Sequence, residues 1–437
     1  MSGGSHGRRA LDGVRILDLS QVAIGPYATL LLASLGAQVI KVESHRRGDT
    51  SRGAVAPLTQ SQRKQYPGLE PGERPWNRTA FFNQRNRGKL GITLDFATAG
   101  GKALLKRLVA LSDAVVENFR ASVLDRQGLG WETLKEVNPR LLYLKLSSQG
   151  ATGPERDYGS LGSTLEQTGG IASITGYSDG VPLLTNETYP DPVAAILGAG
   201  ALIAGLRRVR QTGCGQFVDL SQREVTAAVL GDAMMDYALN GRVAGPIGNR
   251  HPSMAPHGVY PCRDERTEPI DGHHPGRWVA IAVENDAQWR ALCRAMGNPA
   301  WSDDARFATV NGRWRHQDEI DARLAAWTPS WDHVELAELL QGHGVPAGAV
   351  LDGVELLSDR QLVARGWWDQ VTPSDIGRPY PMIGPPWRMS ASPYQPLPAA
   401  PRLGEHNDVV FRDLLGVDEE EYAALQAEAV ISTEAAW

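Results

Sequence analysis

The residues best suited to chemistry lie in a glycine-rich stretch, GPERDYGSLGSTLEQTGGIA, at residues 153–172. It separates two strongly patterned parts of the chain and carries acids and hydroxyl groups, among them Asp157, Ser163 and Glu166. Side chains of these types act as nucleophiles or transfer protons in active sites. We therefore expect this stretch to face a substrate. A helix-start or surface position for Glu166 is the alternative.

A second cluster of candidate binding residues is positively charged. Arg85, Arg87 and Lys89 precede a strand predicted at residues 92–94. Guanidinium and ammonium groups bind phosphate oxygens, so one interpretation is a site for a phosphate-bearing ligand. A solvated run of charges is the other interpretation.

The elements that must position these residues follow a strand–helix–strand order. Residues 14–19 and 39–43 are short apolar runs typical of buried strands, and a helix predicted from Pro26 to about residue 35 separates them. This order predicts a βαβ unit with parallel strands, and hence an α/β domain. The loop SQVAIGP follows the first strand, where doubly wound folds bind ligands, but it lacks the GxGxxG pattern of dinucleotide sites.

The rest of the large domain continues the same alternation. Pro190-Asp191-Pro192 places an acid at the start of an apolar helix predicted at residues 192–209. An acid at that place stabilises the helix by capping it or by pairing with its dipole, which is the role we assign to Asp191. Further strands are predicted at residues 92–94, 114–118, 141–146 and 217–220.

The domain organisation follows from these patterns. Residues 11–225 form the first part of a large α/β domain, and residues 226–260 form a linker. A smaller α+β domain is expected at 261–350. A proline-rich, mostly extended return segment and C-terminal helices at 351–437 then complete the large domain.

Composition narrows the possible partners and location. The chain of 437 residues has a net charge of −6, so nothing in it calls for a nucleic-acid or membrane partner. Its three cysteines form no CxxC pair, and no acid lies at a metal-like spacing beside His251 and His257, so we assign no metal. The N-terminus has no apolar core, and we find no run of 18 apolar residues. We expect a cytoplasmic protein.

Several motifs, in their order and spacing, resemble one family. They are LDLSQVAIGPYATLLLASLGAQVIKVE, NRGKLGITLD, VENFRASVLDRQGL, TGCGQFVDLSQ, GNRHPSMAPHGVYPC, HGVPAGAV and LGEHN. Together they resemble the class III CoA-transferases of the formyl-CoA and carnitine type, whose superfamily includes the α-methylacyl-CoA racemases. The resemblance runs from about residue 11 to the C-terminus. It implies a Rossmann-like large domain, a smaller domain and two chains interlocked like links.

The resemblance also implies how coenzyme A binds. The CoA thioester is a substrate, and no permanently bound cofactor is implied. Val22 and Ala23 would approach the thioester end. The other residues implied in CoA binding are Lys89, Asn118, Phe119 and Arg126, with Arg85 and Arg87 as further candidates. Lys89 and Arg126 offer charge to phosphates, and Phe119 offers an aromatic face or an apolar wall.

The mechanism implied by the family is covalent. An aspartate attacks the thioester to form a mixed anhydride, and the CoA thiolate returns to give an aspartyl-CoA thioester. We place the family aspartate in this chain at Gly162 or Ser163, and neither is a carboxylate. The chain also carries Ala23 where formyl-CoA transferases have a glutamine, and it lacks the histidine expected of the racemase branch.

Three hypotheses follow from this departure. The first is a CoA-transferase that uses a displaced acid, with Glu166 as first candidate and Asp157 as the weaker one. The second is a CoA-binding subunit whose homologous partner chain supplies the aspartate. The third is an acyl-CoA racemase or isomerase that uses different acids. The acyl donor and acceptor are not readable from the sequence.

Overall fold

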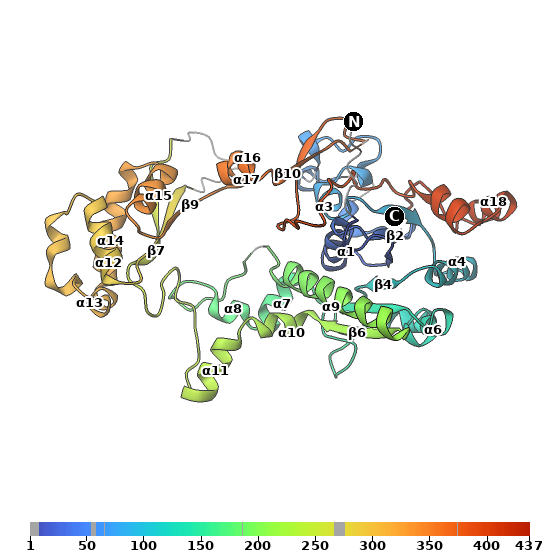
Figure 1. Cartoon of the computed structure of the whole chain (residues 1–437), viewed down its shortest axis with the longest axis horizontal. Coiled ribbons are helices and arrows are strands. Elements are labelled where there is room, and N and C mark those ends of the chain that lie inside the picture. The colour runs from blue at the N-terminus through green and yellow to red at the C-terminus, as the bar shows by residue number, and fades with distance from the viewer. Residues whose placement is uncertain (1–7, 54–57, 65, 186, 266–275, 374) are drawn as a thin grey trace. The chain divides into compact units, whose positions relative to one another are not determined.

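The computed structural model describes residues 8–53, 58–64, 66–185, 187–265, 276–373 and 375–437 (Figure 1). They divide into two compact units. The larger unit comprises Met1–Ala172, Leu184–Val243 and Arg360–Trp437, and the smaller unit comprises Ser173–Leu183 and Ala244–Asp359.

The larger unit is built on a six-stranded sheet with the order β3-β2-β1-β4-β5-β6. Every neighbouring pair in this sheet is parallel, which confirms the predicted α/β class. The strands are β1 (Arg15–Asp18), β2 (Gln38–Glu43), β3 (Leu90–Thr93), β4 (Ala114–Glu117), β5 (Leu142–Ser147) and β6 (Gln216–Ser221).

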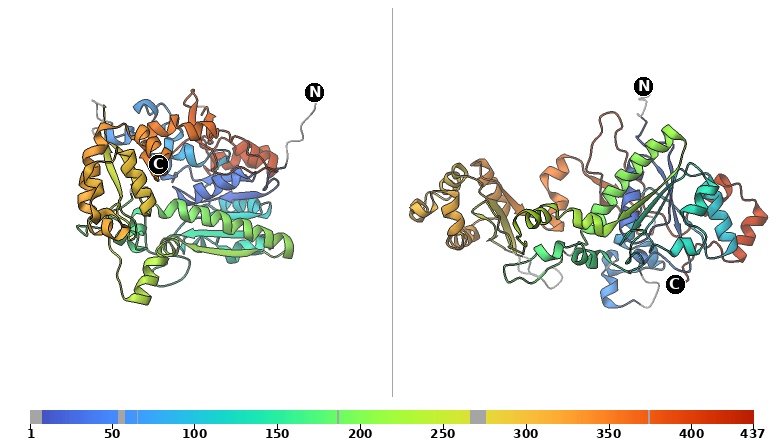
Figure 2. Two further views of the ribbon diagram at one scale, coloured as in Figure 1. Left: turned by 60° about the vertical axis from the view of Figure 1, so that its left-hand side comes forward. Right: turned by 90° about the horizontal axis from the view of Figure 1, so that it is seen from below.

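Helices cover both faces of this sheet, which explains why its inner strands are continuous apolar runs. Figure 2 shows helices on either side of the sheet. Successive strand residues point to opposite faces, so Ile16 belongs to the core under α1 and α9, and Leu17 to the core under α4, α6 and α18. These helices are α1 (Ile24–Ser34), α4 (Ala99–Ala110), α6 (Trp131–Val137), α9 (Pro190–Thr212) and α18 (Glu419–Ala427).

Shorter helices complete the larger unit and connect its strands. They are η1 (Thr50–Arg52), α2 (Gln60–Arg63), η2 (Pro67–Leu69), η3 (Pro75–Asn77), α3 (Ala80–Arg85), α5 (Val123–Arg126), α7 (Gly162–Thr168), α10 (Gln222–Ala228), α11 (Gly231–Asn240), α17 (Arg360–Ala364) and η7 (Val409–Leu414). A further short helix, α8 (Ile171–Ile174), begins in the larger unit and ends in the smaller one. The glycine-rich stretch thus contains one short helix, α7. The segment predicted as a linker contains α11.

The return segment lies along the open edge of the sheet. The backbone N–H of Gly91 in β3 donates to Nδ1 of His406 (3.1 Å), and that of Thr93 donates to Oδ1 of Asn407 (2.9 Å). These contacts cover the unpaired edge of β3. Two strands of the same segment, β10 (Trp368–Val371) and β11 (Tyr380–Ile383), pair antiparallel, so the segment is less extended than predicted.

The smaller unit has its own core around a three-stranded antiparallel sheet of order β7-β8-β9. Its strands are β7 (His257–Cys262), β8 (Arg277–Ala282) and β9 (Ala347–Val350). Its helices are α12 (Asp286–Ala295), η4 (Ala300–Asp303), η5 (Ala305–Phe307), α13 (Val310–Arg315), α14 (Gln317–Trp327), η6 (Thr328–Ser330), α15 (His333–Gly342) and α16 (Gly353–Ser358).

Helix α9 is apolar and long enough to cross a membrane by length and composition, which the sequence analysis did not recognise. Within this structure it belongs to the core of the larger unit, where Ala194, Leu202 and Leu206 are buried against the sheet and α1 packs beside it. Core helices of globular domains have the same apolar character.

Candidate functional site

The candidate site lies where the strand order of the large sheet reverses. β1 and β4 are neighbours, while the chain after β1 continues to β2 on the other side. The loops after these two strands therefore diverge at the carboxyl edge, which is where open α/β sheets bind ligands. A pocket of about 290 Å³ is found here, lined by residues 21–24, 118–120 and 159–162 with Leu146, Ser148, Asp191 and Gln222.

The acid in this pocket is Asp191, in the first turn of α9. Its Oδ1 accepts a hydrogen bond from Nε2 of Gln222 (3.1 Å), a side chain at the start of α10. Burial raises the pKa of Asp191, and hydrogen bonds from Thr188 and Gln222 and the charge of Arg85 oppose that rise. A carboxylate held on one side and facing a pocket on the other can act as a nucleophile or a base.

Gly162, where we placed the family aspartate, cannot hold one in this structure. A Cβ atom there would lie 2.6 Å from Cβ of Thr188 and 2.9 Å from Oδ2 of Asp191. Both distances are shorter than van der Waals contact. The space that a side chain at 162 would need is already filled by the Asp191 carboxylate and its neighbour.

Glu166 is fully buried, and its carboxylate is used to hold the chain before α9. It accepts hydrogen bonds from the backbone N–H of Thr185 (2.8 Å), the hydroxyl of Thr185 (2.5 Å) and the backbone N–H of Tyr189 (3.0 Å). These donors lie in the loop that leads directly to Asp191. Glu166 therefore positions that loop, and the described lining of the pocket does not include it.

The other two predicted acids and hydroxyls also lie outside the described pocket lining. Asp157 is exposed, and its carboxylate accepts hydrogen bonds from the hydroxyl (2.7 Å) and the backbone N–H (3.3 Å) of Ser122. Those bonds, led by the one from the hydroxyl, lower the pKa of Asp157. Ser163 is the second residue of α7 and is half-buried.

Four of the residues expected to bind CoA do come together. Val22 and Ala23 from the loop after β1, and Asn118 and Phe119 from the loop after β4, line the same pocket. Asn118 ties the two loops to each other, because its side chain accepts from the backbone N–H of Gln21 and donates to the carbonyl of Gln21, both at 2.8 Å.

Three of the cations expected to bind CoA lie in different surroundings. Lys89 is buried and bonded to Asp18 (2.9 Å), the carbonyl of Pro26 (3.0 Å) and Asn86 (2.8 Å), and burial lowers its pKa to about 8. Arg126 is exposed and donates to the hydroxyl of Ser122 (2.6 Å). Arg85 lies over the ring of Phe81, 3.6 Å from its centroid.

Arg85 is electrostatically coupled to the pocket acid. Burial lowers the pKa of Arg85, and the negative charges of Asp191 and Glu187 oppose that shift. The sequence grouped Arg85 with Lys89 because they are close in the chain. The fold instead directs one charge to the pocket acid and the other to the buried Asp18.

Asp191 lines the pocket but was not a site candidate from the sequence, because a helix-start acid has an ordinary capping role. A signal was available in the flanking prolines and in Gln222, which follows the strand of the TGCGQFVDLSQ motif. A glutamine that begins a helix beside a parallel strand points to the same sheet edge. Within the described part of the chain, no cluster of metal-binding side chains is found.

Comparison with known proteins identifies the family. The model of CoA-transferase family III matches residues 11–407. The chain belongs to this family. It is 38% identical over 424 residues to a succinyl-CoA–D-citramalate CoA-transferase of Chloroflexus aurantiacus, covering 97% of this chain and 98% of that protein. A succinate–glutarate CoA-transferase of Agrobacterium fabrum is 33% identical, and the match covers 92% of this chain and 95% of that protein.

One further relative and one solved structure are similar to almost the whole chain. The beta subunit of a succinyl-CoA–L-malate CoA-transferase of Chloroflexus aurantiacus is 28% identical, with 96% of this chain and 98% of that protein covered. Among solved structures, a CAIB/BAIF family protein from Brucella suis has a TM-score of 0.79 and 31% identity, covering 93% of this chain and all of that one. The family predicted from the motifs is confirmed. The chain acts between an acyl-CoA and an acid.

Proposed function

We propose that this member of CoA-transferase family III uses a displaced acid, Asp191, as its nucleophile in place of Glu166 or Asp157, and needs no partner chain for that role. The observation that carries the proposal is the position of the Asp191 carboxylate in the pocket at the β1/β4 edge. Gln222 holds one of its oxygens, and a side chain at Gly162 is excluded by the carboxylate itself. Glu166 has its carboxylate occupied by backbone and hydroxyl donors.

The reaction then proceeds by exchanges at one carboxylate. An oxygen of Asp191 attacks the thioester carbonyl of the donor, the C–S bond breaks, and CoA leaves as the thiolate. The thiolate attacks the Asp191 carbonyl of the resulting anhydride, which releases the donor acid and leaves an aspartyl-CoA thioester. The acceptor carboxylate repeats the sequence in reverse and carries CoA away, so no proton is gained or lost overall.

The pocket offers two features that suit these steps. Asp191 must be ionised to attack, and the hydrogen bonds from Gln222 and Thr188 favour its charged form against the effect of burial. The start of α1, at Ala23 and Ile24, opens into the same pocket and has no side-chain cap among the described residues. Its backbone N–H groups can therefore stabilise a negatively charged carbonyl oxygen.

For the substrates we propose succinyl-CoA as donor and a second dicarboxylic acid as acceptor. Support comes from the names of two relatives, which transfer CoA between succinate and D-citramalate or glutarate. A free carboxylate on the substrate needs a cation, and Arg120 lines the pocket. The pocket volume of about 290 Å³ suits the acyl end of the thioester rather than the whole CoA molecule.

One experiment tests both the activity and the nucleophile. The purified chain is incubated with succinyl-CoA alone, treated with borohydride or hydroxylamine, and digested for mass spectrometry. The expected result is a modified Asp191 in the wild-type protein and none in Asp191→Asn. An adduct on Glu166 or Asp157 would overturn the assignment. Exchange of the α-proton in deuterated water without CoA transfer would favour a racemase or isomerase instead.

For the assembly we propose a homodimer of the interlocked kind. Because the chain carries its own pocket acid, a second type of subunit is not needed to supply one. The beta-subunit relative makes a heteromer the alternative. Mass measurement in solution together with transferase activity of the chain expressed alone distinguishes them, since an inactive chain that gains activity only with a homologous partner would contradict the homodimer.

A further inference from the structure

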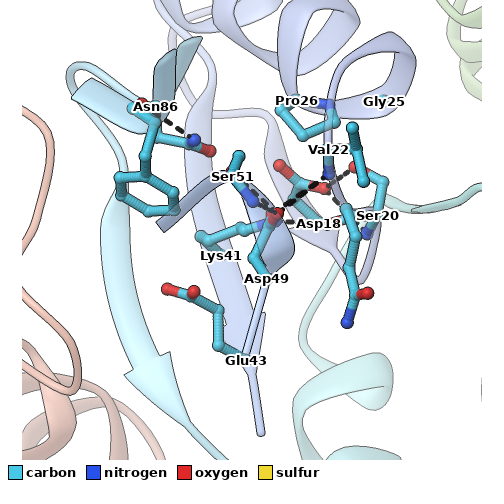
Figure 3. Close-up of polar contacts among 12 residues, drawn as sticks. Asp18, Ser20, Val22, Gly25, Pro26, Lys41, Glu43, Asp49, Ser51 and Asn86 are labelled. Atoms are coloured by element: carbon cyan, nitrogen blue, oxygen red, sulfur yellow. Dashed lines mark hydrogen bonds and ion pairs between the residues drawn. The ribbon is translucent and has the colours of Figure 1, made fainter. Parts of the chain in front are cut away.

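The loop after β1 is held by side chains rather than by a backbone ladder. The N–H of Ser20 donates to Asp18 (3.0 Å), and its carbonyl accepts from Nζ of Lys41. The next residue, Gln21, is bonded at both its N–H and its carbonyl by Asn118. The N–H of Val22 donates to both oxygens of Asp49, at 3.0 and 3.2 Å (Figure 3).

Val22 needs such support because its backbone is in an unfavourable conformation. Its φ angle is 67°, in the left-handed region. A β-branched residue is a true outlier there, since its Cβ substituents crowd the backbone. Such a conformation persists only where the surroundings impose it. Two hydrogen bonds from the Val22 N–H to Asp49 hold the residue itself, next to the bonds by which Asn118 holds Gln21.

Asp49 is itself fixed from the side away from the loop. It is 1% exposed, and its carboxylate also accepts from the backbone N–H (2.9 Å) and hydroxyl (2.7 Å) of Ser51. Lys41 on β2 is fully buried and lies 3.2 Å from Asp49. The ammonium group of Lys41 contacts both Asp49 and the carbonyl of Ser20 in the loop (Figure 3).

This buried pair is unlike a surface ion pair. Neither Asp49 nor Lys41 belongs to the described lining of the pocket, so neither can touch substrate there. A buried ion pair is weak evidence for stability, because desolvation of both charges offsets their attraction. A role in holding a specific backbone geometry explains why charges are placed under this loop.

We propose that Asp49, held by Lys41, is a positioning residue that fixes Val22 in the left-handed conformation and so sets the pocket wall formed by residues 21–24. This rests on the proposed function, because that wall faces the same pocket as Asp191. The wall contains the uncapped start of α1, whose N–H groups must meet the reacting carbonyl. A small displacement of the wall lowers the rate of the chemical step more than it weakens binding.

The first test is steady-state kinetics of Asp49→Asn. We expect kcat to fall about 10- to 100-fold while KM for the CoA thioester stays within about threefold, because only transition-state contacts are misplaced. The matched control is Glu355→Gln in the smaller unit, which removes a partly buried acid that pairs with Arg277 and contacts His333 (2.8 Å). A kcat loss of the same size in the control would overturn the proposal.

The second test asks whether Asp49 acts through Val22. Glycine adopts positive φ without strain, so Val22→Gly should make the loop less dependent on Asp49. We expect the kcat loss caused by Asp49→Asn to be several-fold smaller in the Val22→Gly variant than in the chain that keeps Val22. An equal loss in both backgrounds would show that Asp49 does not act through Val22, and would overturn the proposal.

A third readout does not depend on the reaction. The change in Tm caused by Val22→Gly should be more positive in the chain that keeps Asp49 than in Asp49→Asn. The reason is that Val22 is strained only where Asp49 holds it in the left-handed conformation. Equal changes would overturn the proposal even in an active enzyme. If Asp49→Asn does not fold, Lys41→Gln/Asp49→Asn replaces it, since that pair leaves no unpaired buried charge. Failure of the proposed function appears separately, as wild-type transfer by Asp191→Asn.

Discussion

Two acids of the larger unit, Glu166 in α7 and Asp191 in α9, have opposite surroundings. Glu166 is fully buried and accepts hydrogen bonds from three donors of residues 185–189. Asp191 is half-buried, receives one amide hydrogen bond from Gln222, and faces a pocket. A carboxylate saturated by backbone donors fixes structure, whereas one with an open side is free to react.

The comparison also shows how the two acids depend on each other. Glu166 holds the backbone of Thr185 and Tyr189, and Asp191 follows two residues after Tyr189. Thr188 directly precedes Tyr189. Its φ is positive, at 46°, and its side chain makes a hydrogen bond to the Asp191 carboxylate. The structural acid therefore helps to place the reactive one. We therefore expect substitution of Glu166 to lower mainly the stability of the protein, and substitution of Asp191 to lower mainly its activity.

The largest effect is expected from Asp191→Asn. The amide keeps the shape and can still accept from Gln222, but it is not a nucleophile, so kcat should fall at least about 10³-fold. Because burial raises the pKa of Asp191, folding disfavours its charged form, and that cost is present above the raised pKa. The variant should therefore unfold at the same Tm as wild type or higher. Transfer assays and thermal unfolding at pH 7 measure both.

A lower Tm with the same loss of activity would contradict this view of Asp191. It would mean that the carboxylate contributes mainly to folding, as Glu166 does. From the sequence alone, we expected Asp191 to stabilise an apolar helix by capping it or by pairing with its dipole.

The fold was largely predictable because the sheet depends on local patterns. Runs such as residues 14–19 and 39–43 are apolar on both faces, and βαβ order fixes their direction, so β1 and β2 lie within a residue of their predicted bounds. The return segment was harder, because pairing of β10 with β11 depends on contacts that no periodicity reveals.

The site was predictable only in part. The family resemblance implied Val22, Ala23, Asn118 and Phe119 as binding residues, and the four line one pocket because they follow strands whose ends meet at one edge. Asp191 could not, because the choice between Glu166 and Asp191 depends on which carboxylate is saturated by donors. Those donors lie about twenty residues away in the chain, and a sequence does not show how a loop folds back onto them.

The next largest effect is expected from Gly162→Ala. The added Cβ would lie 2.6 Å from Thr188 and 2.9 Å from Oδ2 of Asp191, so the carboxylate must move. Misplacement of a nucleophile on this scale costs about 10²-fold in kcat. The matched control is Gly200→Ala on α9, where a Cβ meets nothing within 4 Å and alanine favours the helix. Equal kinetics for the two variants would show that the space at 162 is not shared with Asp191.

A smaller effect on rate, but a larger one on stability, is expected from Glu166→Gln. The new amide group must face one of three donors, so one hydrogen bond is lost inside the core, at a cost of about 1–3 kcal/mol. We expect a lower Tm and a loss of about tenfold in kcat through the displaced loop. The hydroxylamine-sensitive adduct should still form on Asp191. Its disappearance, with Tm unchanged, would restore Glu166 as the nucleophile.

The smallest effect at neutral pH, and the most specific, is a shift of the pH profile by Gln222→Glu. The profile of kcat/KM should fall on the acid side as Asp191 becomes protonated, since the pKa of the free enzyme governs this quantity. A second carboxylate in place of the amide donor, which lies 3.1 Å from Asp191, raises the pKa of Asp191 further, so the acid limb should move to higher pH. Gln222→Met, which removes only the hydrogen bond, should move the limb in the same direction by less.

Arg85→Gln should also move the acid limb to higher pH, because it removes a charge that lowers the pKa of Asp191. If none of the three variants moves the acid limb, the group that titrates is not Asp191, and its open position in the pocket is not what distinguishes it from Glu166.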